Sequence, residues 1–268
     1  MAVRPLIITA PDGCRLAGMA HTGAGPVGVL IVPGAPQTRV GAHRGFVALA
    51  GALAARGHPV LRFDRRGLGD SDGEDPGFRG IGPDIAAAGA ALRAAFPHVR
   101  RVIGLGLCDG AAALALNPGG CDALALLNPW LADSDRMGDL PPAAAIRTRY
   151  RDRLRQPRQW LRLLSGEVRL GALLRGLRRA ASGDTPTRTA LAMAERLAAF
   201  PGPVMIALAG ADATAQAFAR QWHGAIFERA RRRGSAQLVT IPGAGHTFAG
   251  QQDAAALTAA VTRFAARC

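Results

Sequence analysis

Short apolar runs alternate with helical stretches along most of the chain, and this alternation restricts the fold more than any other feature. Continuous apolar runs occupy residues 27–34, 59–64, 101–107, 122–129, 202–210 and 236–241. Helical patterns separate most of these runs, over 44–57, 83–96 and the alanine-rich stretch after Asp109. Buried runs joined through helices are typical of a mostly parallel sheet with helices on both faces. The sequence therefore predicts an α/β fold.

The alternation is interrupted once, between residues 131 and 200. This range shows no convincing strand and contains helical stretches that are dense in arginine. We predict an α/β core formed by 1–130 and 201–268, with a helical lid inserted at 131–200.

Part of the predicted lid has a clear apolar stripe. Ile146, Tyr150 and Leu154 recur every four residues and lie among arginines, as on one face of a helix. Two interpretations remain open for the arginines. They form either a solvated helix face or a landing surface for an anionic acyl carrier or a membrane surface.

Composition narrows the range of partners. The formal net charge is +14, and all 33 basic residues are arginine. That charge would suit nucleic acid, but no stacking motif or zinc pattern accompanies it, so we expect no specific nucleic-acid binding. The four cysteines form no CxxC pair, which fits a reducing compartment. With no run of 18 apolar residues to span a membrane, we expect a cytoplasmic protein.

The segment GLGLCDGAAA, residues 104–113, ends an apolar run at a cysteine flanked by glycines. A strand that turns directly into a helix needs Gly106 and Gly110 on either side, and it projects Cys108 above the sheet. The helix N-terminus would favour a thiolate there, so we predict Cys108 as a nucleophile. An inert buried cysteine and a dinucleotide-binding glycine loop are the alternatives.

Two residues after later strands could activate this thiol. Asp212 follows the run 202–210, and His246 lies in a glycine-rich loop after 236–241. Nucleophile, acid and histidine occur in this chain order in α/β-hydrolase triads. His246 would act as the general base and Asp212 would orient it. Asp133 and Asp135, which follow the run 122–129, are alternative candidates for the acid.

These motifs resemble the α/β-hydrolase superfamily over essentially the whole chain, with cysteine where most members carry serine. VPGAPQ, FDRRGLGDSDG and GAGHTF resemble further landmarks of that superfamily. GLCDGA, LLNPW, GADATAQAF and GHTF resemble the exosortase A system-associated hydrolase 1 type. The resemblance implies an α/β-hydrolase fold with a helical lid and a triad of Cys108, His246 and Asp212.

Backbone N–H groups of Ala35 and Asp109 would form the oxyanion hole, because Pro36 has no N–H to donate. A carboxylate aimed at the sulfur would oppose thiolate formation, so we expect the Asp109 side chain to point away. Asp64 is expected to organise its loop with Arg66.

The chemistry that follows is acyl transfer. Thiolate attack on a carboxylic ester, thioester or lactone gives an acyl-enzyme that water or another acceptor resolves. We expect no metal and no organic cofactor. The alternative from another class is a non-catalytic hydrolase-fold protein that binds a small molecule or a partner.

Overall fold

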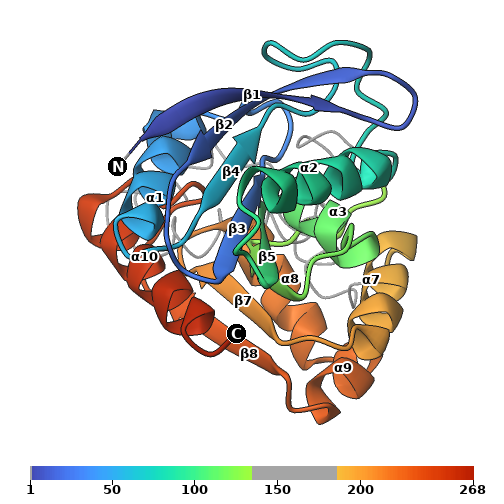
Figure 1. Cartoon of the computed structure of the whole chain (residues 1–268). Helices are drawn as coiled ribbons and strands as arrows, with labels where there is room; N and C mark the ends of the chain where they lie inside the picture. Colours follow the sequence, from blue (N-terminus) through green and yellow to red (C-terminus); the bar gives the residue numbers. More distant parts are fainter. Residues whose placement is uncertain (1, 135–185) are drawn as a thin grey trace, which may run out of the picture.

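The computed structural model describes residues 2–134 and 186–268, and these form one eight-stranded sheet with helices on both faces (Figure 1). The strand order is β1-β2-β4-β3-β5-β6-β7-β8. The strands are β1 (Val3–Thr9), β2 (Arg15–His21), β3 (Val27–Val32), β4 (Val60–Phe63), β5 (Arg101–Leu107), β6 (Ala123–Leu127), β7 (Val204–Ala209) and β8 (Ala236–Ile241). The predicted α/β fold is confirmed.

The sheet is antiparallel at one edge and parallel elsewhere. β1 and β2 form a hairpin, and β2 pairs antiparallel with β4. From β4 through β3 to β8 every neighbouring pair is parallel. The carboxyl ends of these strands therefore meet at one edge, where ligand sites of open α/β sheets lie.

Among the described residues, two helices cover one face of the sheet and the others cover the opposite face (Figure 1). α1 (Gly45–Ala54) and α10 (Gln251–Ala265) lie against each other on the first face. The opposite face carries α2 (Gly82–Ala95), α3 (Asp109–Leu116), α7 (Arg188–Ala199), α8 (Ala213–His223) and α9 (Glu228–Arg232). None of the helices in the described ranges is long and apolar enough to cross a membrane.

The segment between β7 and β8 is not one continuous helix, because α8 ends at His223 before Gly224. There α8 ends and a short 3-10 turn, η3 (Ala225–Phe227), leads into α9. The turn buries Phe227 against Phe218 and Trp222, with both ring centroids 5.5 Å away. Aromatic packing in the core therefore outweighs the helical pattern of the segment.

The predicted lid is described only at its two ends. Leu131 and Ala132 are buried, and α7 packs against α3 and α9. Asp133 joins the ends, since its carboxylate accepts from the Thr189 backbone N–H at 2.9 Å. Residues 135–185 lie outside the described residues, and with them Asp135 and the stripe of Ile146, Tyr150 and Leu154.

Candidate active site

Cys108 occupies the turn between β5 and α3 in a backbone conformation that non-glycine residues rarely adopt. Its φ is 59° and its ψ is −121°. A Cβ added at Gly106 would lie 2.6 Å from the Gly110 carbonyl carbon, and one added at Gly110 would lie 2.5 Å from Val32 O. Both glycines are therefore required by the close approach of backbone segments, and the strained cysteine sits at the apex of the turn.

The same packing argues against the alternative that these glycines form a dinucleotide-binding loop. A Cβ added at Gly104 would lie 2.7 Å from the Leu114 side chain. Protein atoms occupy the space beside Gly104, Gly106 and Gly110, where a dinucleotide fingerprint would admit a pyrophosphate. The glycines serve the turn itself.

Asp212 and His246 lie in direct contact. Asp212 Oδ2 is 3.0 Å from His246 Nδ1, and both side chains are largely shielded from solvent. Asp212 is also the N-cap of α8, because Oδ2 accepts from the Ala215 backbone N–H at 2.9 Å. The carboxylate is held in place by a helix terminus and can fix the orientation of the imidazole ring.

Asp133, the alternative acid, is engaged elsewhere. Its carboxylate accepts from Thr189 and forms an ion pair with Arg79 at 3.2 Å. Burial raises the pKa of this carboxyl, but hydrogen bonds from Thr189 and Arg188 together with Arg79 outweigh it and leave the pKa lowered. Asp133 therefore joins the two described ends of the segment predicted as a lid, whereas Asp212 contacts the histidine.

The Cys108 thiol does not have the low pKa that a helix N-terminus alone would produce. Burial raises its pKa to about 12, and the nearby Asp109 and Asp212 carboxylates add to this effect. The Asp109 backbone N–H acts in the opposite direction, because it favours the charged sulfur. The expected resting thiolate is wrong, since desolvation of a side chain that is 4% exposed outweighs the helix terminus.

The Asp109 side chain is directed to a buried arginine. Arg65 Nη1 donates to Asp109 Oδ2 at 2.7 Å, and Arg65 Nη2 donates to Asp75 at the same distance. Asp109 Oδ1 has no hydrogen-bond partner among the described residues and would lie 2.5 Å from a Cβ at Gly34. Burial raises the pKa of this carboxyl, while Arg65 and the nearby Ala35 N–H lower it. The carboxylate is therefore engaged by Arg65 but remains within electrostatic reach of the Cys108 sulfur.

The two candidate oxyanion donors flank the nucleophile. The Asp109 backbone N–H lowers the pKa of the thiol, so it lies near the sulfur. On the other side, a Cβ added at Gly34 would lie 3.3 Å from Cys108 Cβ, which places the segment before Ala35 beside the turn. In this conformation the Ala35 N–H faces the Asp109 carboxylate, without the geometry of a full hydrogen bond.

Asn128 is a site residue that sequence reasoning missed. It is fully buried directly after β6, with φ 44°. Its Nδ2 donates to His246 O at 2.8 Å, and its Oδ1 accepts from the Ala209 backbone N–H at 2.8 Å. Two positions later, the backbone N–H of Trp130 donates to Cys108 O at 3.1 Å. The signal available in the sequence was the polar residue in LLNPW at the end of an apolar strand.

The loop after β4 is organised differently from expectation. Asp64 is fully buried and accepts from the side chain and backbone N–H of Arg39 and from the Asp70 N–H. Arg66 instead pairs with Asp84 and Asp12. The expected partnership of Asp64 with Arg66 is wrong, because a neighbouring loop supplies the arginine.

The chain combines a mostly parallel sheet with a strained cysteine on a strand-to-helix turn and an aspartate–histidine pair after later strands. Residues 29–261 match the model of the Alpha/beta hydrolase family. The chain belongs to this family. No curated protein matches the sequence.

Solved structures resemble this α/β hydrolase in fold. An esterase of Pyrococcus furiosus superposes with a TM-score of 0.69 at 18% identity, covering 99% of this chain and 91% of that one. Est1E of Butyrivibrio proteoclasticus, with ferulic acid bound, has a TM-score of 0.59 at 19% identity, covering 97% of both chains. A thermophilic esterase of Thermogutta terrifontis has a TM-score of 0.56 at 21% identity, covering 98% of both.

Backbone strain in this hydrolase gathers around the candidate site. Among the described residues, the non-glycine positions with positive φ are His43, Arg44, Cys108, Asn128 and Phe248. All of them lie in the segments after β3, β5, β6 and β8, at the carboxyl edge of the sheet. Strained backbone persists where the surrounding structure enforces it, which is frequent at functional sites.

The described residues contain no group of three or more His, Cys, Asp or Glu side chains that could hold a metal ion. The buried carboxylates of Asp64 and Asp109 are instead paired with arginine. What the site offers is a thiol, an imidazole oriented by a carboxylate, and backbone N–H groups.

Proposed function

We propose that the protein hydrolyses carboxylic esters or thioesters through a Cys108–His246–Asp212 triad and an acyl-enzyme intermediate. The observation that carries the proposal is the 3.0 Å contact between Asp212 Oδ2 and His246 Nδ1. It occurs at the sheet edge where Cys108 is held in a strained turn. A nucleophile, a base and an orienting acid in one place support covalent acyl transfer.

In the first half of the reaction, His246 takes the thiol proton while the sulfur attacks the carbonyl carbon. Nδ1 faces Asp212, so Nε2 is the nitrogen that receives this proton. The carbonyl oxygen becomes an oxyanion beside the Asp109 N–H. The Ala35 N–H, which faces the Asp109 carboxylate in this conformation, would have to turn toward the oxyanion to act as the second donor. The bond to the leaving group then breaks, and the leaving oxygen or sulfur takes the proton from Nε2. Cys108 is left as an acyl-thioester.

In the second half, His246 removes a proton from water as the water oxygen attacks the thioester carbonyl. The carbon–sulfur bond breaks, the carboxylic acid leaves, and the thiolate recovers the proton. Because the resting pKa of the thiol is about 12, its proton leaves only as the sulfur attacks. His246 is therefore needed in both halves of the cycle.

The class of substrate can be proposed more closely than the fold alone allows. The exosortase A system-associated hydrolase 1 resemblance and the cysteine chemistry favour an ester or thioester handled in the cytoplasm. We propose that the acyl group arrives as a small ester or on an anionic acyl carrier. The high arginine content of the chain supports an anionic carrier.

The test is intact-protein mass spectrometry after brief exposure to p-nitrophenyl acetate. Wild-type protein is expected to gain one acetyl group and to release p-nitrophenol. Cys108→Ala is expected to do neither, whereas Cys121→Ala, which removes another buried cysteine, should behave like wild type. Equal acetylation of wild type and Cys108→Ala would place the reactive group elsewhere and overturn the mechanism.

A non-catalytic binding role is the second candidate, and the raised pKa of the Cys108 thiol favours it. In that case neither p-nitrophenyl acetate nor p-nitrophenyl butyrate acylates the protein or is turned over. Turnover that depends on both Cys108 and His246 excludes this role.

A further inference from the structure

We propose that the cavity between α1 and α10 holds the acyl chain of the substrate, so that the hydrolase prefers aliphatic acyl groups of medium length. The inference rests on the proposed acyl-enzyme mechanism and adds a substrate class to it. The cavity has a volume of about 440 Å³. That value lies within the range of small-molecule sites in proteins.

The walls of the cavity are mainly hydrocarbon. The large side chains that line it are Phe46, Leu49, Leu107, Leu127, Phe248 and Leu257. Thr258 is one of the polar residues in the lining, and its hydroxyl donates to Ala254 O of the same helix at 2.8 Å. A saturated chain therefore meets apolar surface along this wall and leaves no hydroxyl without a partner.

One end of the cavity lies next to the candidate triad. Leu107 directly precedes Cys108, and Thr247 directly follows His246. Leu107 and Leu127 are paired in register on neighbouring parallel strands, so they lie side by side at the carboxyl edge. An acyl group attached to the Cys108 sulfur thus starts beside this end.

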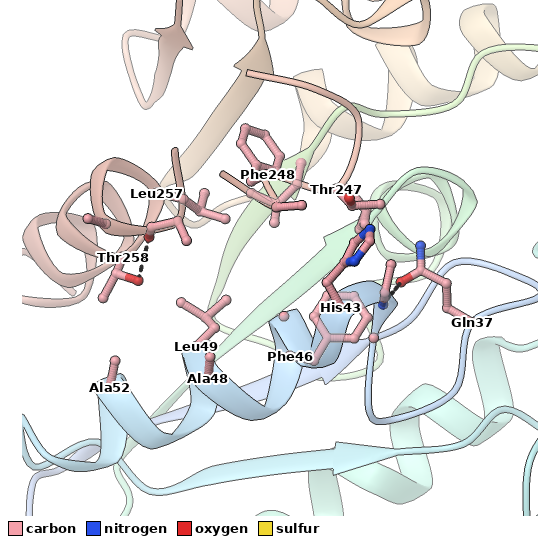
Figure 2. A pocket seen from close by; sticks show the side chains of 18 of the residues that line it. Gln37, His43, Phe46, Ala48, Leu49, Ala52, Thr247, Phe248, Leu257 and Thr258 are labelled. Atoms are coloured by element: carbon pink, nitrogen blue, oxygen red, sulfur yellow. Dashed lines mark hydrogen bonds between the residues drawn. The ribbon is translucent and has the colours of Figure 1, made fainter. Parts of the chain in front are cut away.

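Three polar side chains lie at that same end, whereas Arg56 lies at the far one. Figure 2 shows Gln37, His43 and Thr247 together, with Ala52 at the opposite end of the view. His43 and Phe248, which lie on the two loops that flank this end, both have φ 52°. A polar, strained entrance and an apolar body are what an ester needs, since its carbonyl is polar and its chain is not.

The two helices that border the cavity expose small side chains to it. Ala48 and Ala52 are four residues apart on α1, and Ala255 and Ala259 are four apart on α10. Residues at this spacing share one helix face, about 6 Å apart along the axis. Both helices begin at the site edge, so the cavity continues along them, away from Cys108.

The chemistry of the lining selects the occupant. Arg56 is the one Arg, Asp or Glu side chain among the described lining residues, and it follows the end of α1, away from the site. A peptide or a nucleotide would bury polar groups without partners on these walls. A medium-length alkyl chain would bury none.

The experiment measures kcat/KM for p-nitrophenyl acetate, butyrate and octanoate. Wild-type enzyme is expected to prefer octanoate over acetate by about tenfold or more, because each buried methylene adds favourable transfer free energy. Ala52→Leu and Ala259→Leu, which fill the cavity from opposite walls, should remove about tenfold of that preference.

Ala86→Leu is the matched control. Ala86 is an exposed alanine on α2, on the other face of the sheet, so the same substitution should leave the chain-length profile unchanged. An unchanged profile in both filled variants, with acetate turnover still dependent on Cys108, would overturn the acyl-chain site and leave the proposed function standing. If the filled variants changed their oligomeric state without a change in the chain-length profile, the cavity would be a subunit contact. That result would also overturn the acyl-chain site.

A direct binding measurement separates the two proposals. Octanoic acid titrated into Cys108→Ala by calorimetry should bind, and the added Ala52→Leu substitution should abolish the binding. Binding that is lost in this way supports the acyl-chain site even where no ester is turned over, in which case only the catalytic proposal fails. Octanoic acid that does not bind Cys108→Ala contradicts the site.

Discussion

Asn128 connects the backbones of two segments that carry the candidate catalytic residues. Its side-chain amide reaches His246 O on one side and the Ala209 N–H, three residues before Asp212, on the other. Its own backbone N–H donates to Ala207 O at 3.0 Å. A buried side chain with both polar atoms satisfied holds its neighbours in one arrangement. Asn128 is therefore a positioning residue for His246.

Replacing Asn128 is expected to lower kcat more than it changes KM. Asn128→Ala leaves the Ala209 N–H and His246 O without their partner, which costs about 1–3 kcal/mol of stability for each group. Ester turnover should fall about tenfold or more because the imidazole loses its fixed position. Asn128→Asp keeps the acceptor for Ala209 but loses the donor, and it should share the loss of kcat.

The matched control is Asn117→Ala. Asn117 also precedes a proline, but it caps the far end of α3, away from the carboxyl edge. Steady-state kinetics with p-nitrophenyl butyrate should show wild-type kcat for this variant. Equal effects of the two substitutions, or a change confined to KM in Asn128→Asp, would contradict the positioning role.

At the scale of single elements, the turn from β5 to α3 depends on close backbone packing that only glycine permits. Backbone atoms of Val32 and of the turn itself fill the space that a Cβ would need at Gly110 and Gly106. The strand, the turn and the first turn of α3 thus form a single rigid unit around Cys108.

Gly106→Ala is expected to destabilise the protein by about 1–3 kcal/mol, since its Cβ would lie 2.6 Å from the Gly110 carbonyl carbon. Gly45→Ala is the contrasting substitution. Gly45 has helical φ and ψ of −59° and −41°, and nothing lies within 4 Å of an added Cβ. It should stabilise the protein by about 0.5 kcal/mol or more. Thermal unfolding measures both changes, and the same sign for the two would refute the packing argument.

The order of the elements was readable from the sequence because it depends on local patterns. Strand-to-helix alternation predicted the sheet, and the positions of Cys108, Asp212 and His246 after their strands placed them at one edge. The pKa of Cys108 was misjudged because burial is set by residues distant in the chain. Asn128 was missed for the same reason, since its partners lie 81 and 118 residues away.

At the scale of the whole molecule, the antiparallel edge of the sheet contains a buried histidine–arginine contact. Arg62 Nε donates to His21 Nε2 at 3.0 Å, and both residues are buried. Burial and the Arg62 charge lower the pKa of His21 to about 4. His21 therefore stays neutral in the folded protein through the mildly acidic range.

This contact predicts a loss of stability in acid. The unfolded chain binds a proton at His21 near pH 6.5, whereas the folded protein does so only near pH 4. The free energy of unfolding should therefore fall between these values, by up to about 1.4 kcal/mol per pH unit. His21→Gln keeps an acceptor for Arg62 and should flatten this dependence in denaturant titrations.

His98→Gln serves as the control, because His98 is exposed, whereas His21 is buried. Its dependence on pH should match that of wild type. If His21→Gln and wild type lost stability in parallel from pH 6.5 to pH 4, another group would be responsible for the acid sensitivity.

The residues proposed for catalysis are divided between the two ends of the chain. Cys108 belongs to the first six strands, while Asp212 and His246 follow β7 and β8. A ribosome releases the N-terminal part first, so a nascent chain acquires its thiol long before its base. Until the last strand joins the sheet, the thiol lacks the base that the proposed mechanism assigns to it. Under that mechanism, catalytic competence comes late in the synthesis of the chain.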